Sequence, residues 1–129
     1  MAAIAILNLD KIRKFIKNGN VIIDGLYSFD EYKVLKKEFG KKFTTIAIYA
    51  PPSIRYQRLA ERKLTRKDKV ARNRQYTAKE AESRDYAEIE KINKGGPIAI
   101  ADYTILNIKS LMYFKRQLGK VYKEIEENI

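Results

Sequence analysis

The sequence predicts an α/β protein in which helices cover both faces of a short parallel sheet, a three-layer α/β/α arrangement. Three short runs of strand-forming residues, at 21–23, 43–49 and 103–106, alternate with longer helical patterns. This alternation is typical of parallel strands joined by right-handed helical connections. A length of 129 residues with 45% hydrophobic residues fits one domain with a core of its own, so residues 1–129 are predicted as a single unit.

The first strand is predicted between two helices. Apolar residues at helical spacing indicate a helix over residues 2–18, and Asn18-Gly19-Asn20 has the residues of a turn. Val21-Ile22-Ile23 is then a continuous apolar run, which favours a strand covered on both faces. Ser28 and Glu31 have the spacing of a capping box, so the next helix is expected to begin there and to end at Gly40.

The remaining elements follow the same reasoning. Residues 43–49 are rich in β-branched and aromatic side chains, and Pro51-Pro52 opens a helix after them. Residues 63–76 are rich in Lys and Arg and predict an exposed basic segment. Thr77 and Glu80 form a second capping-box pattern for a helix that runs to about Asn93 and that Gly95-Gly96-Pro97 stops. A third strand at 103–106 and a helix over 109–128 complete the chain.

The composition limits the chemistry and suggests the partners. The chain has no cysteine and no histidine, which excludes disulfides, thiolate catalysis and histidine acid–base catalysis. The net charge of +11 favours polyanionic partners, and a nucleotide or a phosphorylated small molecule is expected ahead of nucleic acid. The sequence contains no apolar run of about 20 residues, the length that a membrane span needs. We therefore expect a cytoplasmic protein without a membrane partner.

Asp24 is the first candidate for a functional residue. It directly follows the predicted strand 21–23, and ligands of open α/β sheets bind at the carboxyl edge of the strands. A carboxylate at that edge is suited to hold Mg²⁺ or to orient a hydroxyl group. The alternative interpretation is an Asp that caps the turn at Gly25.

A series of arginines is the second candidate. Arg55, Arg58 and Arg62 recur at helical spacing, and Arg84 lies on the next predicted helix. Guanidinium groups bind phosphate in a two-pronged manner and keep their charge, which suits a phosphate site. The alternative is a solvated face with exposed ion pairs, for example between Arg58 or Arg62 and Glu61 or Asp85.

The glycines do not form a phosphate-binding loop. The pattern G-x-x-x-x-G-K-[ST] does not occur, and neither does the dinucleotide fingerprint. The nearest glycine-rich stretch, Gly95-Gly96, is predicted to end a helix, whereas an anion site uses the start of one.

Three segments together resemble a known family. VIIDGLYSFDEY (21–32), IAIYAPPSIRYQRLAER (46–62) and ESRDYAEIEKINKGGPIAIADYTILN (82–107) are similar to the second half of P-loop nucleotide kinases of the dephospho-coenzyme A kinase type, with small AAA-like ATPases as the nearest branch. The resemblance extends over about residues 9–126. It implies a kinase-like fold that lacks its N-terminal phosphate loop, with ATP and Mg²⁺ as cofactors.

The resemblance also implies roles for residues. Asp24 matches the strand-end acid near the phosphates, the magnesium ion and the acceptor hydroxyl, which makes it the metal ligand. Arg58 and Arg62 match arginines at the base of a lid, residues 63–83 match the lid, and Arg84 matches the arginine at its end.

The remaining ligand-binding residues are Arg55, which belongs to the same arginine series, and Asn107, which matches the region beside the nucleotide base. The expected function is ATP binding for phosphoryl transfer. The alternative is a non-catalytic remnant that binds polyanions or associates with itself, because unpaired strand edges invite pairing with another chain.

Overall fold

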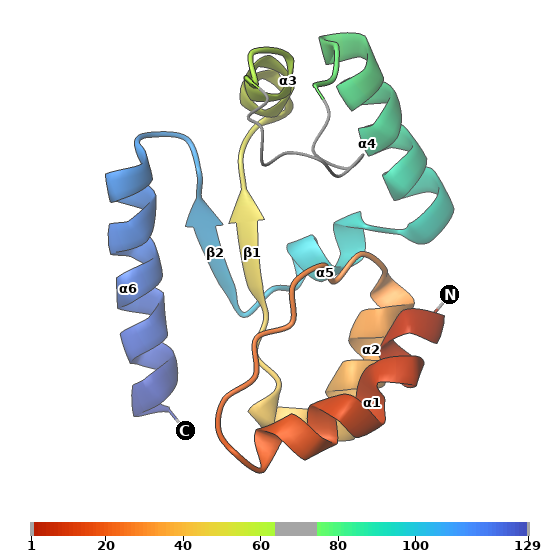
Figure 1. Cartoon of the computed structure of the whole chain (residues 1–129), viewed down its shortest axis with the longest axis vertical. Coiled ribbons are helices and arrows are strands. Elements are labelled where there is room, and N and C mark those ends of the chain that lie inside the picture. The colour runs from red at the N-terminus through yellow and green to blue at the C-terminus, as the bar shows by residue number, and fades with distance from the viewer. Residues whose placement is uncertain (1, 64–74, 129) are drawn as a thin grey trace.

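The computed structural model describes residues 2–63 and 75–128 of the chain (Figure 1). In chain order its elements are α1 (Ala3–Ile16), α2 (Phe29–Phe39), the 3-10 helix η1 (Gly40–Lys42), β1 (Ile46–Tyr49), α3 (Pro52–Ala60), α4 (Ala78–Ile92), α5 (Gly95–Ala99), β2 (Tyr103–Leu106) and α6 (Leu111–Glu127). The chain is therefore mixed α/β, as the sequence predicts. None of the helices in the described ranges is long and apolar enough to cross a membrane.

The sheet consists of β1 and β2, which run parallel with Ile46 opposite Tyr103 and Tyr49 opposite Leu106. The predictions of strands at 43–49 and 103–106 are confirmed over 46–49 and 103–106. Figure 1 shows α6 beyond β2, while α1 and α2 lie on the side of β1 and α3 lies at the carboxyl ends of both strands. This carboxyl edge is where loops after the two strands meet.

A side-chain clasp joins the starts of the two strands. The Asp102 carboxylate accepts hydrogen bonds from the backbone N–H and the hydroxyl of Thr45, both at 2.8 Å, and the Thr45 hydroxyl oxygen accepts one from the Asp102 N–H at 3.1 Å. Thr45 is buried. Because these residues are 57 positions apart in the chain, the clasp fixes the register of the parallel pair.

Two predicted capping boxes are confirmed. The Ser28 hydroxyl accepts from the Glu31 N–H at 3.1 Å, and the Glu31 carboxylate accepts from the Ser28 N–H at 3.1 Å. Thr77 and Glu80 make the same reciprocal pair at the start of α4. These bonds satisfy backbone donors at helix ends that have no partner within the helix.

The end of α4 differs in part from the prediction. Asn93 ends the helix in the left-handed conformation, with φ 53° and ψ 44°, as expected for a residue that terminates a helix. Gly95-Gly96-Pro97 does not only stop α4, because it also begins the short helix α5. Proline is tolerated there since the first turn of a helix needs no N–H donor.

The predicted strand at Val21–Ile23 is wrong. Residues 17–19 form a turn, residues 20–28 belong to no helix or strand, and Ile22 is 94% exposed. The physical reason is that strand-forming residues make a strand only when a neighbouring strand takes up their backbone groups. In the described residues no backbone hydrogen bond links this segment to β1 or β2.

The apolar core lies between α1 and α2. Ala5, Ile12 and Leu35 are buried, and partly buried apolar side chains pack around them. Ile12 belongs to the apolar pattern of α1 and is buried, but Ile4 and Leu7 of the same pattern are 67% and 81% exposed. Part of the apolar pattern of α1 therefore remains in solvent.

Removing the Thr45–Asp102 clasp should destabilise the fold. Burial raises the pKa of the Asp102 carboxyl, while the Thr45 hydrogen bonds and the charge of Lys36 lower it, and the net pKa lies below the ordinary 3.8. Asp102→Ala is expected to lower the free energy of unfolding by about 1–2 kcal/mol at pH 7, the range for hydrogen bonds to a charged group. Urea unfolding measures this change.

The same clasp predicts a pH dependence. A carboxyl with a lowered pKa in the fold contributes stability fully above its unfolded pKa of 3.8, and loses it as the pH falls through the folded pKa. The stability gap between the wild type and Asp102→Ala should therefore narrow below pH 3.8. Glu90→Ala, which removes an exposed carboxylate that makes no hydrogen bond to the described residues, serves as the control and should leave the free energy of unfolding at pH 7 unchanged. A gap that stays constant between pH 7 and pH 3 would contradict this role for the carboxylate.

Candidate functional site

The carboxyl edge of the sheet carries the candidate site. The chain leaves β1 through Ala50 and Pro51 into α3, and it leaves β2 through residues 107–110 into α6. Ser110 caps α6 by accepting a hydrogen bond from the Tyr113 N–H at 3.3 Å, a capping role that the sequence analysis missed. Both exits from the sheet thus lead directly into helices that carry basic side chains.

Arg58 connects the two exits. One nitrogen of its guanidinium group donates to the Asn107 carbonyl oxygen at 2.7 Å and to the Asn107 side-chain oxygen at 3.1 Å. The other donates to the carbonyl oxygen of Lys109 at 3.4 Å. Two of the predicted site residues, Arg58 and Asn107, are therefore brought together, although they are 49 positions apart.

Two further cations lie at the start of α6. The Lys109 ammonium lies 4.9 Å from the ring centre of Tyr113, and the Arg116 guanidinium lies 5.7 Å from the same ring. The sequence analysis missed these residues, although positions 109, 113 and 116 have the spacing of one helical face. We call Arg58, Lys109 and Arg116 the α6 cation cluster.

The α6 cation cluster differs from the other arginine sites in its partners. Arg13, Arg55 and Arg84 each pair with a carboxylate. In the part of the chain that the structure describes, no ion pair involves Arg58, Lys109 or Arg116, since their contacts are with carbonyl and amide oxygens or with an aromatic ring. Their positive charge is therefore available to an anion from solution.

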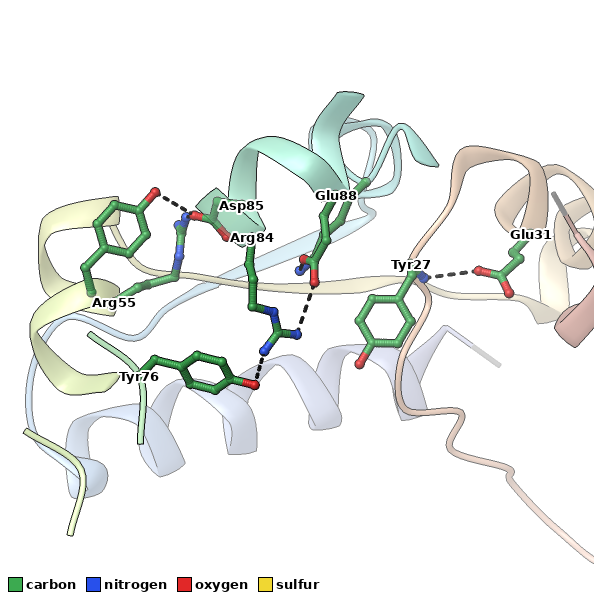
Figure 2. Close-up of polar contacts among 9 residues, drawn as sticks. Tyr27, Glu31, Arg55, Tyr76, Arg84, Asp85 and Glu88 are labelled. Carbon is green, nitrogen blue, oxygen red and sulfur yellow. Dashed lines mark hydrogen bonds and ion pairs between the residues drawn. The ribbon is translucent and has the colours of Figure 1, made fainter. Parts of the chain in front are cut away.

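Arg55 has a structural partner instead. Its guanidinium group forms an ion pair with Asp85 on α4 and donates to the Ala50 carbonyl oxygen at 2.6 Å. Figure 2 shows Arg55 against Asp85. Tyr56 donates its hydroxyl to the same Asp85 carboxylate at 3.0 Å. Partial burial and this hydrogen bond raise the pKa of Tyr56. Arg55 thus holds α3 against α4, and its charge is neutralised.

Arg84 lies in a second network on α4. It donates to the Tyr76 hydroxyl, its guanidinium group is 4.8 Å from the Tyr76 ring centre, and it pairs with Glu88 at 3.4 Å (Figure 2). Glu88 also pairs with Lys94, whose ammonium lies 5.5 Å from the ring centre of Tyr27. In the described residues no contact links Arg84 to Arg58, so the predicted convergence of these two arginines is not formed by direct contact.

The remaining predicted site residues are not gathered here. Arg62 is half-buried and follows the end of α3. Of the proposed lid at 63–83, residues 64–74 lie outside the described residues, and residues from Ala78 onward belong to α4.

Asp24 is exposed on the unpaired segment between α1 and α2, because the strand that was predicted to deliver it to the sheet edge does not form. No hydrogen bond or ion pair in the described ranges joins it to the arginines, and no group of three or more metal-ligand side chains occurs there. A lone exposed carboxylate supplies too few ligands to hold Mg²⁺ without the phosphates of a ligand.

Comparison with known proteins identifies archaeal relatives. The chain is 34% identical over 128 residues to the UPF0200 protein of Pyrococcus horikoshii, covering 98% of this chain and 64% of that protein. It is 32% identical over 125 residues to the UPF0200 protein of Thermococcus sibiricus, covering 95% and 62%. A UPF0200/UPF0201 protein of Archaeoglobus fulgidus is 32% identical over 130 residues, and this match covers 100% of this chain and 38% of that protein. No family model matches the chain.

These matches correct the resemblance drawn from the sequence. The relatives are named UPF0200 proteins, and neither their names nor a family model indicates a P-loop or a dephospho-coenzyme A kinase. The structure also lacks the strand at 21–23 on which that resemblance partly depended. The chain spans less than two thirds of the length of the Pyrococcus and Thermococcus relatives.

The Arg55–Asp85 pair should be structural. Asp85→Ala leaves the partly buried Arg55 without its carboxylate and removes the acceptor of the Tyr56 hydroxyl, so we expect the free energy of unfolding to fall by about 1.5–3 kcal/mol. Chemical denaturation at pH 7 measures the effect. Glu82→Ala removes the same charge from the same helix at an exposed position that makes no hydrogen bond within the described ranges, and it should change stability by less than about 0.5 kcal/mol. If both variants lowered the free energy of unfolding equally, the Arg55–Asp85 ion pair would contribute no more than the removal of any negative charge from α4.

Proposed function

We propose that the carboxyl edge of the sheet binds the phosphate groups of a nucleotide or another phosphorylated small molecule. The observation that carries this proposal is the α6 cation cluster, in which Arg58, Lys109 and Arg116 have no carboxylate partner among residues 2–63 and 75–128. Arg13, Arg55 and Arg84 each form an ion pair with a carboxylate, so among the described residues positive charge is left unbalanced at this edge.

The geometry of the cluster suits a phosphate. Arg58 is held by backbone and amide oxygens of the turn after β2, so its guanidinium group is positioned without losing its charge. An arginine ordered in this way loses little side-chain freedom when it binds a phosphate in a two-pronged manner. The Tyr113 ring, which lies beside both Lys109 and Arg116, adds an aromatic face next to the charges.

Binding, and not catalysis, is the function that the contacts support. Transfer of a phosphoryl group from ATP requires Mg²⁺ and an organised acid near the phosphates. Asp24 was expected to supply that acid, but it has no contact with the arginines in the described ranges. Mg²⁺–ATP therefore enters the proposal as a ligand, in the cytoplasm, and groups for the transfer step would have to come from outside this chain.

Titration of Mg²⁺–ATP into the purified chain tests the proposal. Arg58→Gln and Arg116→Gln should each weaken binding about tenfold or more, because a hydrogen bond between charged groups contributes about 1.5–3 kcal/mol. Isothermal titration calorimetry at constant ionic strength measures the affinity. Arg58→Lys keeps the positive charge but not the two-pronged guanidinium group, and its ATP affinity should lie between those of the wild type and Arg58→Gln.

Arg13→Gln is the matched control. It removes one positive charge from α1, where Arg13 pairs with Asp10 and Glu38, and it should leave ATP affinity unchanged. Equal weakening in Arg13→Gln and Arg58→Gln would reduce the site to a nonspecific effect of net charge. If single-stranded nucleic acid binds more tightly than ATP, with a steep dependence on salt, the ligand class is wrong.

A further inference from the structure

The two edges of the sheet differ. Tyr103 N–H donates to the Thr45 carbonyl oxygen at 3.1 Å, and Asn107 N–H donates to the Tyr49 carbonyl oxygen at 2.7 Å. Because backbone groups of successive strand residues point to opposite sides, the N–H and C=O groups of Ile46 and Ile48 face away from β2. In the described ranges these groups have no hydrogen-bond partner beyond β1.

The outer edge of β2, in contrast, is covered by a side chain. The Gln117 amide on α6 donates to the Leu106 carbonyl oxygen at 2.9 Å and accepts from the Leu106 N–H at 3.3 Å. A side-chain amide therefore takes the place of a neighbouring strand at this residue. At the opposite edge, no side chain of the described residues bonds to the outward backbone groups of Ile46 or Ile48.

The side chains around the β1 edge are apolar and exposed. Ile46 is 40% exposed and Ile48 is 58% exposed, and Ile22, on the unpaired segment between α1 and α2, is 94% exposed. The strand itself reads IAIY, with no charged residue and no proline. Natural sheet edges that face solvent usually carry charges, proline or a bulge, which prevent pairing with other chains.

Two observations indicate what occupies this edge. The matched relatives in Pyrococcus and Thermococcus extend well beyond the match, which covers 64% and 62% of them. A second copy of this chain is disfavoured, because each copy has a net charge of +11 and two copies would repel.

We propose that the β1 edge accepts a third strand, an apolar extended segment that corresponds to the part of the longer relatives outside the match. Pairing would satisfy the outward backbone groups of Ile46 and Ile48 and cover their side chains. It would also give residues 21–23 the neighbour that their strand-forming composition requires, and so complete the three-layer arrangement that the sequence predicts.

Peptide binding tests the proposal. Overlapping synthetic peptides of about 12 residues, longer than a typical strand, should tile the part of the Pyrococcus horikoshii relative outside its match. One region of that part should bind the intact chain, and amide hydrogen exchange should slow at Ile46 and Ile48. Protection confined to α4 or α6, or no binding by any peptide at about millimolar concentration, where even weak ligands bind, would overturn it.

A pair of variants locates the contact. Ile48→Pro removes an N–H that faces away from β2, so the β1–β2 ladder should persist while peptide affinity falls at least tenfold. Ile48→Val keeps the N–H and a β-branched side chain, and it should bind as the wild type does. Unchanged exchange at Ala47 and Ile105 checks that Ile48→Pro is folded. Equal affinity in the two variants, or a dimer of the chain alone with Ile46 and Ile48 protected, would refute the assignment.

Discussion

The parallel pairing of β1 with β2 is the constraint on which the rest of the structure depends. It is the contact between strands that brings the segment at 45–60 to the segment at 102–117, and the Thr45–Asp102 clasp sets its register. Parallel strands cannot be joined by a tight turn, so the intervening residues must return over the sheet. Arg58 reaches Asn107 and Lys109 only because this register aligns the two strand ends.

The distribution of charge follows from the same arrangement. Acidic residues on α4 are used in packing, since Asp85 neutralises Arg55 and Glu88 lies between Arg84 and Lys94. The turn after β2 brings carbonyl oxygens, not carboxylates, to Arg58. Arg55 and Arg84 are therefore held in place with their charge balanced by a carboxylate, whereas Arg58 is held in place without a carboxylate partner in the described residues.

Local sequence patterns predicted most of the helices and strands. Features that depend on residues far apart in the chain could not be predicted in this way. Ser28 with Glu31 and Thr77 with Glu80 are three residues apart, so both helix starts follow from short-range hydrogen bonds. Val21–Ile23 has strand composition, but a strand depends on a neighbour that its own residues do not specify. At the site, the arginine spacing indicated cations, yet the partners that neutralise Arg55 and leave Arg58 charged come from distant residues.

The hydrogen bonds of the Gln117 amide to Leu106 affect how readily the sheet can pair with the sheets of other copies. A sheet with two open edges can act as both template and addition site, so that copies stack without limit into fibres. Because Gln117 occupies the backbone groups of Leu106, an incoming strand finds fewer free backbone groups at β2 than at β1. Growth of the sheet is then favoured on one side, and one added strand uses the open edge of β1.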